Sequence, residues 1–235
     1  MDGSLIESWA SLKSFRPKSE PRDGDPPGDG PNTPPDDAPK AGKAPKNETV
    51  DFHGERRSNE THESTTDPEA RLARKSNGTT AKLCYTGHAL MENKNGLLMD
   101  VRLTTACGTA ERNTAIEMLN DAVPGRRRIT VAADRGYDTK DFVRQCRELN
   151  VSPHVAQNTN RKGGSAIDKR TTRHPGYAKS LKFRKRIEEF FGWMKTVGGL
   201  RKSRLIGKAK TGFLTKMVGA AYNLLRIARL SAATP

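Results

Sequence analysis

The chain has little of what builds a disulfide scaffold, a zinc site or a membrane span. Its three cysteines, Cys84, Cys107 and Cys146, are odd in number and show no CxxC spacing, which argues against a disulfide framework and a zinc centre. We expect three reduced, buried thiols. No apolar run has membrane-spanning length, and the N-terminus lacks the apolar core of a signal peptide. We therefore expect a cytoplasmic protein.

Hydrophobic residues are also scarce, and negative charge is outnumbered. Only 33% of the 235 residues are hydrophobic, so the chain can hold one sizeable domain but need not be folded throughout. The net charge of +15 favours a polyanionic partner, most simply nucleic acid. Residues 161–216 hold 17 Lys or Arg against 3 Asp or Glu. A basic stretch is often only a solvated surface, but one this concentrated is typical of a phosphate track.

The segment Pro17–Thr49 has no apolar residue larger than alanine, and it holds nine of the fourteen prolines. Such a segment cannot bury enough surface to offset its ordering entropy, so we expect a disordered or polyproline-like insertion. Ahead of it, Leu5, Trp9 and Leu12 recur at helix-like spacing, while the residues before Gly3 fit the end of a strand. Beyond it, His62 is expected to be an exposed polar histidine, because no ligand cluster accompanies it.

Residues 82–103 predict an antiparallel hairpin. The runs Lys82–Met91 and Leu97–Leu103 are strand-like, and the segment 92–96 between them contains an Asn-Gly turn signal. A helix beginning near Thr109 should follow. Its apolar face is predicted to consist of Ala115, Met118, Leu119 and Ala122.

Ile129–Ala133 is a short, continuous apolar run, which predicts a strand buried on both faces and a candidate for the central strand. Asp134 follows it directly, in the word Asp-Arg-Gly-Tyr-Asp. An aspartate before glycine at a strand end is most often a turn residue or a cap. The carboxyl end of a buried strand is, however, where α/β sheets place ligands. Asp134 is therefore a candidate for catalysis, and Asp138 for a cap.

Three further elements are predicted in the second half of the chain. Thr139 should start a helix with Phe142, Cys146 and Leu149 inside, and Val151–Ala156 should form a strand. The last helix is predicted to pack across the sheet. Its expected inner face is Phe213, Met217, Ala220, Ala221, Leu224, Leu225 and Ala228.

The stretch Leu181–Thr196 carries the strongest pattern. Ile187, Phe190, Phe191 and Met194 follow the i, i+3, i+4, i+7 spacing of a buried helical face. A second stripe of Arg184, Glu188, Phe191 and Lys195 overlaps one edge of it. For this helix alone, a solvated i, i+4 Arg–Glu pair worth about 0.2–0.5 kcal/mol is an equally good interpretation.

The spacing Arg184-x3-Glu188-x6-Lys195 resembles the Tyr-x2-Arg-x3-Glu-x6-Lys motif of DDE-type bacterial insertion-sequence transposases, in their insertion-sequence-five-like branch. Leu181 stands at the tyrosine position, and Tyr177 is out of register. If Glu189 were the glutamate of the motif, its Arg and Lys positions would fall on Lys185 and Thr196, which do not both match. The opening word Asp-Gly-Ser-Leu-Ile-Glu-Ser-Trp is similar to the first-aspartate word of these transposases. The word that begins at Asp134 is similar to their second.

The resemblance implies an α/β fold with a ribonuclease-H-like mixed sheet flanked by helices. It divides the chain into the start of a catalytic domain (1–16), the Pro-rich insertion (17–49) and the DDE catalytic domain (50–235). Asp2, Asp134 and Glu188 would be the catalytic carboxylates and would hold two Mg²⁺ ions, which Mn²⁺ replaces. The residues implied in DNA contact are Arg184, Lys195, Arg201, Lys202 and Arg204.

By the same resemblance, water hydrolyses a phosphodiester at the end of the element, and the freed 3′-hydroxyl then attacks target DNA. The partners would be element ends and target DNA, with a homo-oligomer on DNA allowed and a nucleoid-associated location. Members of the family carry a region ahead of the first aspartate, so a truncated or split copy, with Asp2 poorly held and little activity of its own, is expected. A catalytically inactive remnant that binds DNA non-specifically and a ribonuclease-H-like nuclease stay open as alternatives.

Overall fold

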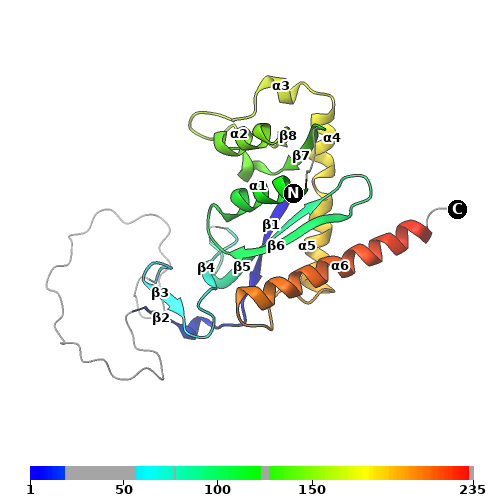
Figure 1. Cartoon of the computed structure of the whole chain (residues 1–235). Coiled ribbons are helices and arrows are strands. Elements are labelled where there is room, and N and C mark those ends of the chain that lie inside the picture. Colours follow the sequence, from blue (N-terminus) through cyan, green and yellow to red (C-terminus); the bar gives the residue numbers. More distant parts are fainter. Residues whose placement is uncertain (19–56, 77, 123–126, 233–235) are drawn as a thin grey trace.

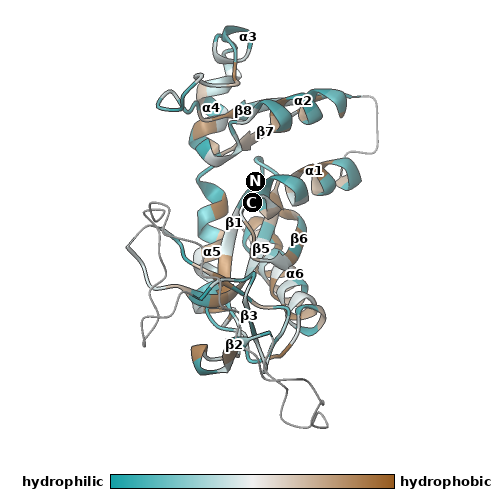
Figure 2. Cartoon of the chain, turned by 90° about the vertical axis from the view of Figure 1, so that its left-hand side faces the viewer, coloured by the Kyte–Doolittle hydropathy of each residue, from teal (hydrophilic) through white to brown (hydrophobic). Residues whose placement is uncertain are grey.

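The computed structural model describes residues 1–18, 57–76, 78–122 and 127–232. These residues form a mixed α/β structure, as the sequence predicts. Helices α2 and α3 with strands β7 and β8 lie at one end of the molecule, and β2 and β3 lie at the other (Figures 1 and 2). The predicted Pro-rich insertion lies outside the described residues except for Pro17 and Lys18. Pro17 pairs with His62 in a short sheet, so this first residue of the predicted insertion is part of a strand.

The largest sheet is built around the long strand β5 (Lys82–Met91). Strand β1 (Asp2–Glu7) runs antiparallel along one edge of β5, and β4 (Arg71–Ala73) and β6 (Leu98–Thr105) lie on the other edge. The hairpin predicted for residues 82–103 is confirmed. All six residues of β1 are paired with β5, so the expectation that Asp2 is poorly held is wrong.

Strands β7 (Ile129–Ala133) and β8 (Val151–Val155) form a separate parallel pair. Both were predicted as strands, but the interpretation of β7 as the central strand is wrong, because β5 occupies the middle of the largest sheet. A hydrogen bond ties the two sheets together: the backbone nitrogen of Met1 donates to the carbonyl of Ala132, at 2.9 Å. The start of β1 therefore lies beside β7.

The segment after β1 is not the predicted helix. It holds one 3₁₀ turn, η1 (Leu12–Ser14), followed by β2 (Phe15–Pro17), which pairs with β3 (His62–Ser64). Trp9 is half exposed, because the strand pairing of β1 overrides the helix-like spacing. The expectation of an exposed His62 is also wrong. Its ring is buried and stacks on Phe15, with ring centroids 5.5 Å apart.

Two predicted helices flank β7. Helix α1 (Ala110–Ala122) buries Ala115, Met118 and Leu119, and α2 (Lys140–Glu148) buries Phe142, Val143 and Cys146. These side chains pack with β7 and β8 in one core cluster. Thr139 caps α2, since its hydroxyl accepts a hydrogen bond from the Phe142 amide at 3.3 Å. Among the cysteines, Cys84 and Cys146 are buried as expected. Cys107 is exposed, which corrects the prediction of a third buried thiol.

Three helices follow β8: α3 (Lys169–Thr172), α4 (Gly176–Phe183) and α5 (Arg186–Thr196). Arg184 and Lys185 have right-handed helical backbone angles, so α4 continues into α5 almost without interruption (Figures 1 and 2). The predicted apolar face of α5 is confirmed. It packs with residues of β1, β5 and β6 in a second core cluster. Its buried members are Ile187, Phe190, Phe191 and Met194.

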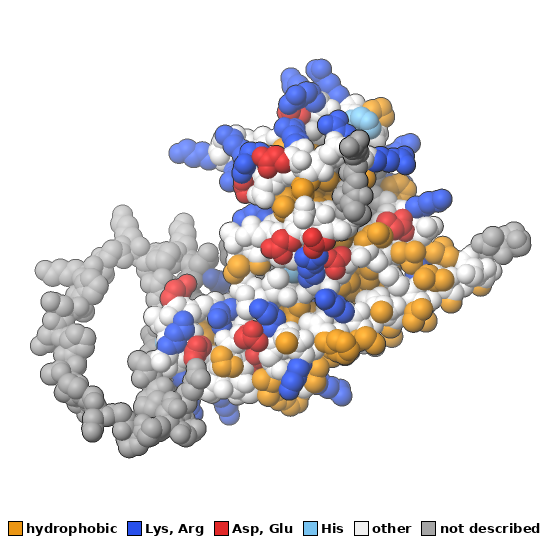
Figure 3. Space-filling model, in the orientation of Figure 1, with side chains coloured by type: hydrophobic (Ala, Val, Ile, Leu, Met, Phe, Trp, Pro, Cys, Tyr) orange, Lys and Arg blue, Asp and Glu red, His pale blue; other side chains and the backbone are white. Residues whose placement is uncertain are grey.

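The last helix, α6 (Lys208–Ala232), packs on β6, but the prediction of its inner face is wrong. Its buried residues are Thr211, Thr215, Val218 and Gly219, whereas Phe213 and Leu224 are 67% and 69% exposed. The apolar side chains line the outer side of α6 in Figure 3. The reason is close approach: a Cβ at Gly219 would lie 2.9 Å from a methyl carbon of Val101. Small residues therefore face the sheet.

No helix in the described ranges has both the length and the apolarity needed to cross a membrane.

Candidate active site

A cavity of about 610 Å³ opens at the start of β1. It brings together side chains from β1, β4, β5, the start of α1, the end of β7 and α5. Its polar and charged lining residues are Asp2, Ser4, Asn59, Arg74, Lys75, Thr86, Cys107, Glu111, Asp134 and Lys195. Of the three carboxylates predicted to be catalytic, Asp2 and Asp134 line this cavity.

Asp2 is the first residue of β1, where it pairs with Ala89. Its carboxylate accepts a 2.9 Å hydrogen bond from the Gly3 amide. Burial raises the pKa of the Asp2 carboxyl, the Gly3 hydrogen bond opposes this rise, and the charge of Asp134 adds to it. Arg184 acts in the opposite direction and lowers this pKa. The two aspartates therefore interact electrostatically across the cavity, with a guanidinium nearby.

Asp134 follows the last residue of β7 and begins the 3₁₀ turn η2 (Arg135–Tyr137). Its backbone is extended, and its carboxylate accepts a 2.8 Å hydrogen bond from the Gly136 amide. The glycine in the Asp-Arg-Gly-Tyr-Asp word thus leaves room for the carboxylate: a Cβ at Gly136 would lie 3.1 Å from an Asp134 oxygen. This turn keeps the Asp134 side chain at the mouth of the cavity.

Glu111 is a third carboxylate at the cavity that the sequence analysis missed. It lies in the first turn of α1. A Cβ at Gly3 would lie 2.8 Å from a Glu111 carboxylate oxygen, so the absence of a side chain at Gly3 is what admits Glu111 beside β1. Partial burial raises the pKa of the Glu111 carboxyl, and the charges of Asp2 and Asp134 raise it further. No sequence pattern links residue 111 to the two aspartates, since only the fold joins α1 to β1.

Of the three residues of the Arg-x3-Glu-x6-Lys motif, Lys195 is the one that lines the cavity. Lys195 is half-buried. Burial lowers its pKa, and the positive charges of Lys75 and Arg201 lower it further. Arg184 acts on Asp2 through its charge, and its buried Nε has no hydrogen-bond partner among the described residues. Glu188 is exposed and is not a lining residue of the cavity.

The other predicted DNA contacts lie in the connection between α5 and α6. Arg201, Lys202 and Arg204 are all exposed. The backbone of this segment adds to the end of β1: the Glu7 amide donates to the Arg201 carbonyl at 3.2 Å, and the Ser203 amide donates to the Glu7 carbonyl at 2.7 Å. These cations are therefore fixed to the strand that carries Asp2.

Asp138 is neither a cavity residue nor the helix cap that the sequence predicted, because Thr139 caps α2. It is 2% exposed. Its carboxylate accepts hydrogen bonds from the amides of Asn158, at 2.6 Å, and Ala166, at 2.8 Å. Asp138 therefore holds the two ends of the loop that follows β8. The two aspartates of one sequence word have different roles in the fold.

Within the described part of the chain, no three His, Cys, Asp or Glu side chains are arranged as ligands of a single metal ion. The pair Asp2 and Asp134 still offers the oxygen donors that Mg²⁺ prefers. Magnesium ions are commonly held by one or two carboxylates, with substrate phosphates and water completing the shell. The donor chemistry at the cavity fits a divalent cation that is shared with a phosphate.

Two strand ends thus place the carboxylates of Asp2 and Asp134 on one cavity of a mixed α/β protein. The sequence profile of the family described as "Transposase DDE domain" matches residues 51–224. The chain belongs to this family and is a DDE transposase by membership. The match contains Asp134, Glu188 and Lys195, while Asp2 lies ahead of it. A search of curated proteins and a search of solved structures found no match.

Proposed function

We propose that the cavity is the catalytic site of an insertion-sequence transposase of the insertion-sequence-five-like branch, with Asp2, Asp134 and Glu188 as its carboxylates. It would cut DNA at the ends of the element and join them to a target. The observation that carries the proposal is the meeting of Asp2 and Asp134, which are distant in sequence, at one cavity within a transposase domain.

The strand arrangement supports a ribonuclease-H-like fold for this domain. Strands β6, β5 and β1 are consecutive antiparallel neighbours. The contact between Met1 and Ala132 brings the parallel pair β7 and β8 to the free side of β1. If the Met1–Ala132 contact is taken as the pairing of β1 with β7, the strands form one sheet in the order β6-β5-β1-β7-β8. In that order β1 and β7, which are the first and fourth of these five strands along the chain, are neighbours, and their aspartates therefore share a cavity.

Transposases of this family generally use divalent metal ions, and Mg²⁺ is the ion we propose here. Asp2 and Asp134 would hold it, because both line the cavity and present hard oxygen donors. Held by these carboxylates, divalent ions would stabilise the attacking and leaving oxygens of an in-line phosphoryl transfer. The raised pKa of Asp2 in the metal-free protein reflects burial and the neighbouring Asp134 charge, which a cation would offset.

The cations around the cavity position the DNA strand. Lys195 lines the cavity itself, and Arg184 has a buried guanidinium nitrogen with no hydrogen-bond partner in the described part of the chain. Arg201, Lys202 and Arg204 would contact the backbone further along. Such contacts fix the register of DNA without reading its sequence.

Glu188 requires a change of position to act with the two aspartates. It is exposed, between Arg184 and Lys195 on one side of the α4–α5 helix. At 100° per residue these three side chains lie within about 40° of one another around the axis. DNA held by Arg184 and Lys195 would therefore lie next to Glu188.

The placement of Glu188 outside the lining of the cavity also favours a second candidate: a transposase remnant that binds DNA without cutting it. The two candidates differ in one measurement. We expect the complete chain to convert supercoiled plasmid to nicked product with Mg²⁺ or Mn²⁺, and to lose this activity on chelation or in Asp134→Asn. DNA binding with no metal-dependent nicking above the Asp134→Asn background would support the remnant instead.

A further inference from the structure

A second cavity, of about 340 Å³, runs along β8 and reaches Arg128, which precedes β7, the strand that Asp134 follows. Its lining includes three arginines, two histidines and two hydroxyl groups. These polar and charged residues are Arg128, Arg147, Ser152, His154, Arg170, Thr171 and His174. None of them belongs to the candidate active site. We call this set the arginine pocket.

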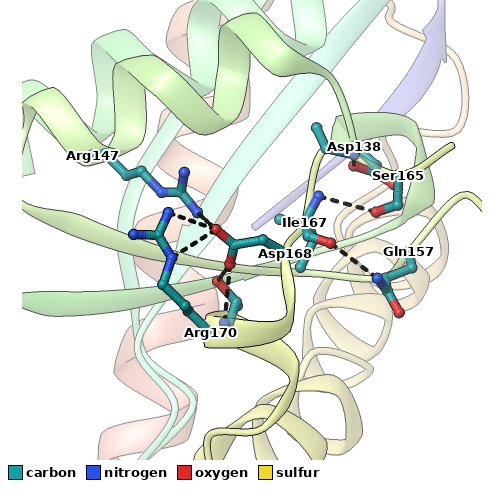
Figure 4. Close-up of polar contacts among 9 residues, drawn as sticks. Asp138, Arg147, Gln157, Ser165, Ile167, Asp168 and Arg170 are labelled. Atoms are coloured by element: carbon teal, nitrogen blue, oxygen red, sulfur yellow. Dashed lines mark hydrogen bonds and ion pairs between the residues drawn. The ribbon is translucent and has the colours of Figure 1, made fainter. Parts of the chain in front are cut away.

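Two of the arginines are held side by side by a single carboxylate. Asp168 Oδ2 accepts hydrogen bonds from Arg170 Nε at 3.0 Å, from Arg170 Nη2 at 2.8 Å and from Arg147 Nη2 at 3.2 Å (Figure 4). The hydrogen bonds from Arg170 are the main reason that the pKa of the Asp168 carboxyl is lowered to about 2. Asp168 therefore stays charged and keeps both guanidinium groups at the pocket.

Asp168 is itself fixed by the fold. Its other oxygen accepts from the Thr171 amide at 3.2 Å, and the preceding Ile167 is buried in the core. Gln157 donates to the Ile167 carbonyl at 3.0 Å (Figure 4). Asp138 holds the same loop through its two backbone hydrogen bonds. The pair of arginines is thus positioned before any ligand arrives, which reduces the entropy cost of binding.

The charges of the arginine pocket do not balance. Asp168 is the carboxylate shared by Arg147 and Arg170, while Arg128 has no ion-pair partner among the described residues. The Gly176 amide donates to His174 Nδ1 at 3.0 Å, so the neutral ring carries its proton on Nε2 and is a donor there. Three guanidinium groups with one carboxylate leave an excess of positive charge. Such a site is suited to a phosphate or another oxyanion that accepts two parallel hydrogen bonds from a guanidinium group.

We propose that the arginine pocket binds a phosphate of the DNA backbone, at a distance from the site where the DNA is cut. The proposal rests on the proposed function, because it concerns the same DNA. Arg128 precedes β7 and Asp134 follows it, so the two ends of this strand are roughly 20 Å apart at about 3.3 Å per residue. A duplex with about 3.4 Å per nucleotide reaches the pocket about six nucleotides from the cut.

The test is DNA affinity of the complete chain, measured by fluorescence anisotropy in EDTA at several salt concentrations. We expect Arg170→Gln and Arg128→Gln each to weaken binding to DNA of any sequence. Each should also reduce the magnitude of the slope of log affinity against log salt by about one. Arg144→Gln is the matched control, because Arg144 is on α2 but does not line the pocket. It should leave affinity and slope unchanged.

Arg170→Gln could disturb the loop that holds Asp168. Arg128→Gln avoids this problem, because Arg128 makes no hydrogen bond to Asp168. A second arm uses duplexes with one neutral methylphosphonate at each position in turn. Wild type should lose affinity for a substitution about six nucleotides from the cleaved end, and Arg128→Gln should show no further loss there. A third arm titrates inorganic phosphate by calorimetry.

Pocket variants that bind DNA like Arg144→Gln would overturn the proposal. Tight binding of inorganic phosphate that depends on Arg128, with DNA affinity unchanged, would assign the pocket to a free anion and would also overturn it. Because every arm is run without metal, these results are independent of whether the chain cuts DNA.

Discussion

The backbone nitrogen of Met1 donates to the carbonyl of Ala132, and this 2.9 Å contact joins the strand of Asp2 to the strand that ends at Asp134. The two sheets share no other pairing in the described chain. The contact explains how two aspartates separated by 131 residues line one cavity. It also means that changes at the start of β1 should affect both carboxylates together.

The two aspartates of the Asp-Arg-Gly-Tyr-Asp word should respond differently to neutralisation. Asp138→Asn replaces one of the two carboxylate oxygens with an NH₂ donor, so one of the two backbone amides that it holds loses its acceptor. We therefore expect the free energy of unfolding to fall by about 1–3 kcal/mol. Asp141→Asn, at an exposed position on α2, should change it by less than about 0.5 kcal/mol. Denaturant unfolding measures both. Equal stability of the two variants would contradict the role given to Asp138.

The register of the α5 motif predicts different roles for two adjacent glutamates. Both Glu188 and Glu189 are exposed in the first turn of α5, so neither Glu→Gln change should unfold the chain. Glu188→Gln should abolish metal-dependent nicking or strand transfer, and Glu189→Gln should do much less. Circular dichroism establishes that both are folded. The assignment of Glu188 fails if the two folded variants lose activity equally.

Glu111 adds negative charge to the cavity of Asp2 and Asp134. Its removal in Glu111→Gln should weaken the attraction for a divalent cation, so the Mg²⁺ concentration that gives half-maximal nicking should rise about tenfold. Glu117→Gln, one and a half turns further along α1 and outside the cavity, is the control. An unchanged Mg²⁺ requirement in Glu111→Gln would show that Glu111 has no part in the site.

His88 on β5 should make stability depend on pH. Its ring is buried, with Nε2 placed 2.8 Å from the Thr104 hydroxyl, and burial lowers its pKa from 6.5 to about 4. Between these values the unfolded chain binds a proton that the folded chain does not, so stability is lost as pH falls from 6.5 towards 4. The full loss is about 3 kcal/mol.

The measurement compares wild type with His88→Gln across this range. The advantage of wild type over the variant in unfolding free energy should shrink by up to about 3 kcal/mol between pH 7 and pH 4. Other titrating groups cancel in the difference. Parallel stability curves for the two proteins would show that His88 does not carry this pH dependence.

The sequence correctly predicts the helices and strands whose pattern of apolar residues fits only one type of secondary structure. The hairpin of β5 and β6, the helix faces of α1, α2 and α5, and the strands β7 and β8 are of this kind. The predictions fail where contacts between residues distant in the sequence determine the local structure. The spacing of Leu5, Trp9 and Leu12 is helical, but pairing with β5 makes a strand. On α6 the apolar side is outside, because Gly219 lets the helix approach β6 closely.

The candidate site divides in the same way. Asp2 and Asp134 could be selected from sequence because each stands in a short, specific word at a strand end. Glu111 could not, because its place depends on the missing side chain of Gly3, on another strand. The residues of the arginine pocket come from α2, β8, α3 and the segments before β7 and after α3, with no common spacing in the sequence. Sequence gives its charge but not its geometry.

We propose that the site formed by Asp2 and Asp134 catalyses the joining of a DNA 3′-hydroxyl to a target strand. The most direct measurement is a strand-transfer assay with Mg²⁺ or Mn²⁺, in which a precut duplex bearing the end of the element is mixed with supercoiled plasmid. We predict joined product with a 3′-hydroxyl end, none with a 3′-dideoxy end, and none with Asp134→Asn. Joined product from the Asp134→Asn chain, or from the dideoxy end, would contradict the account.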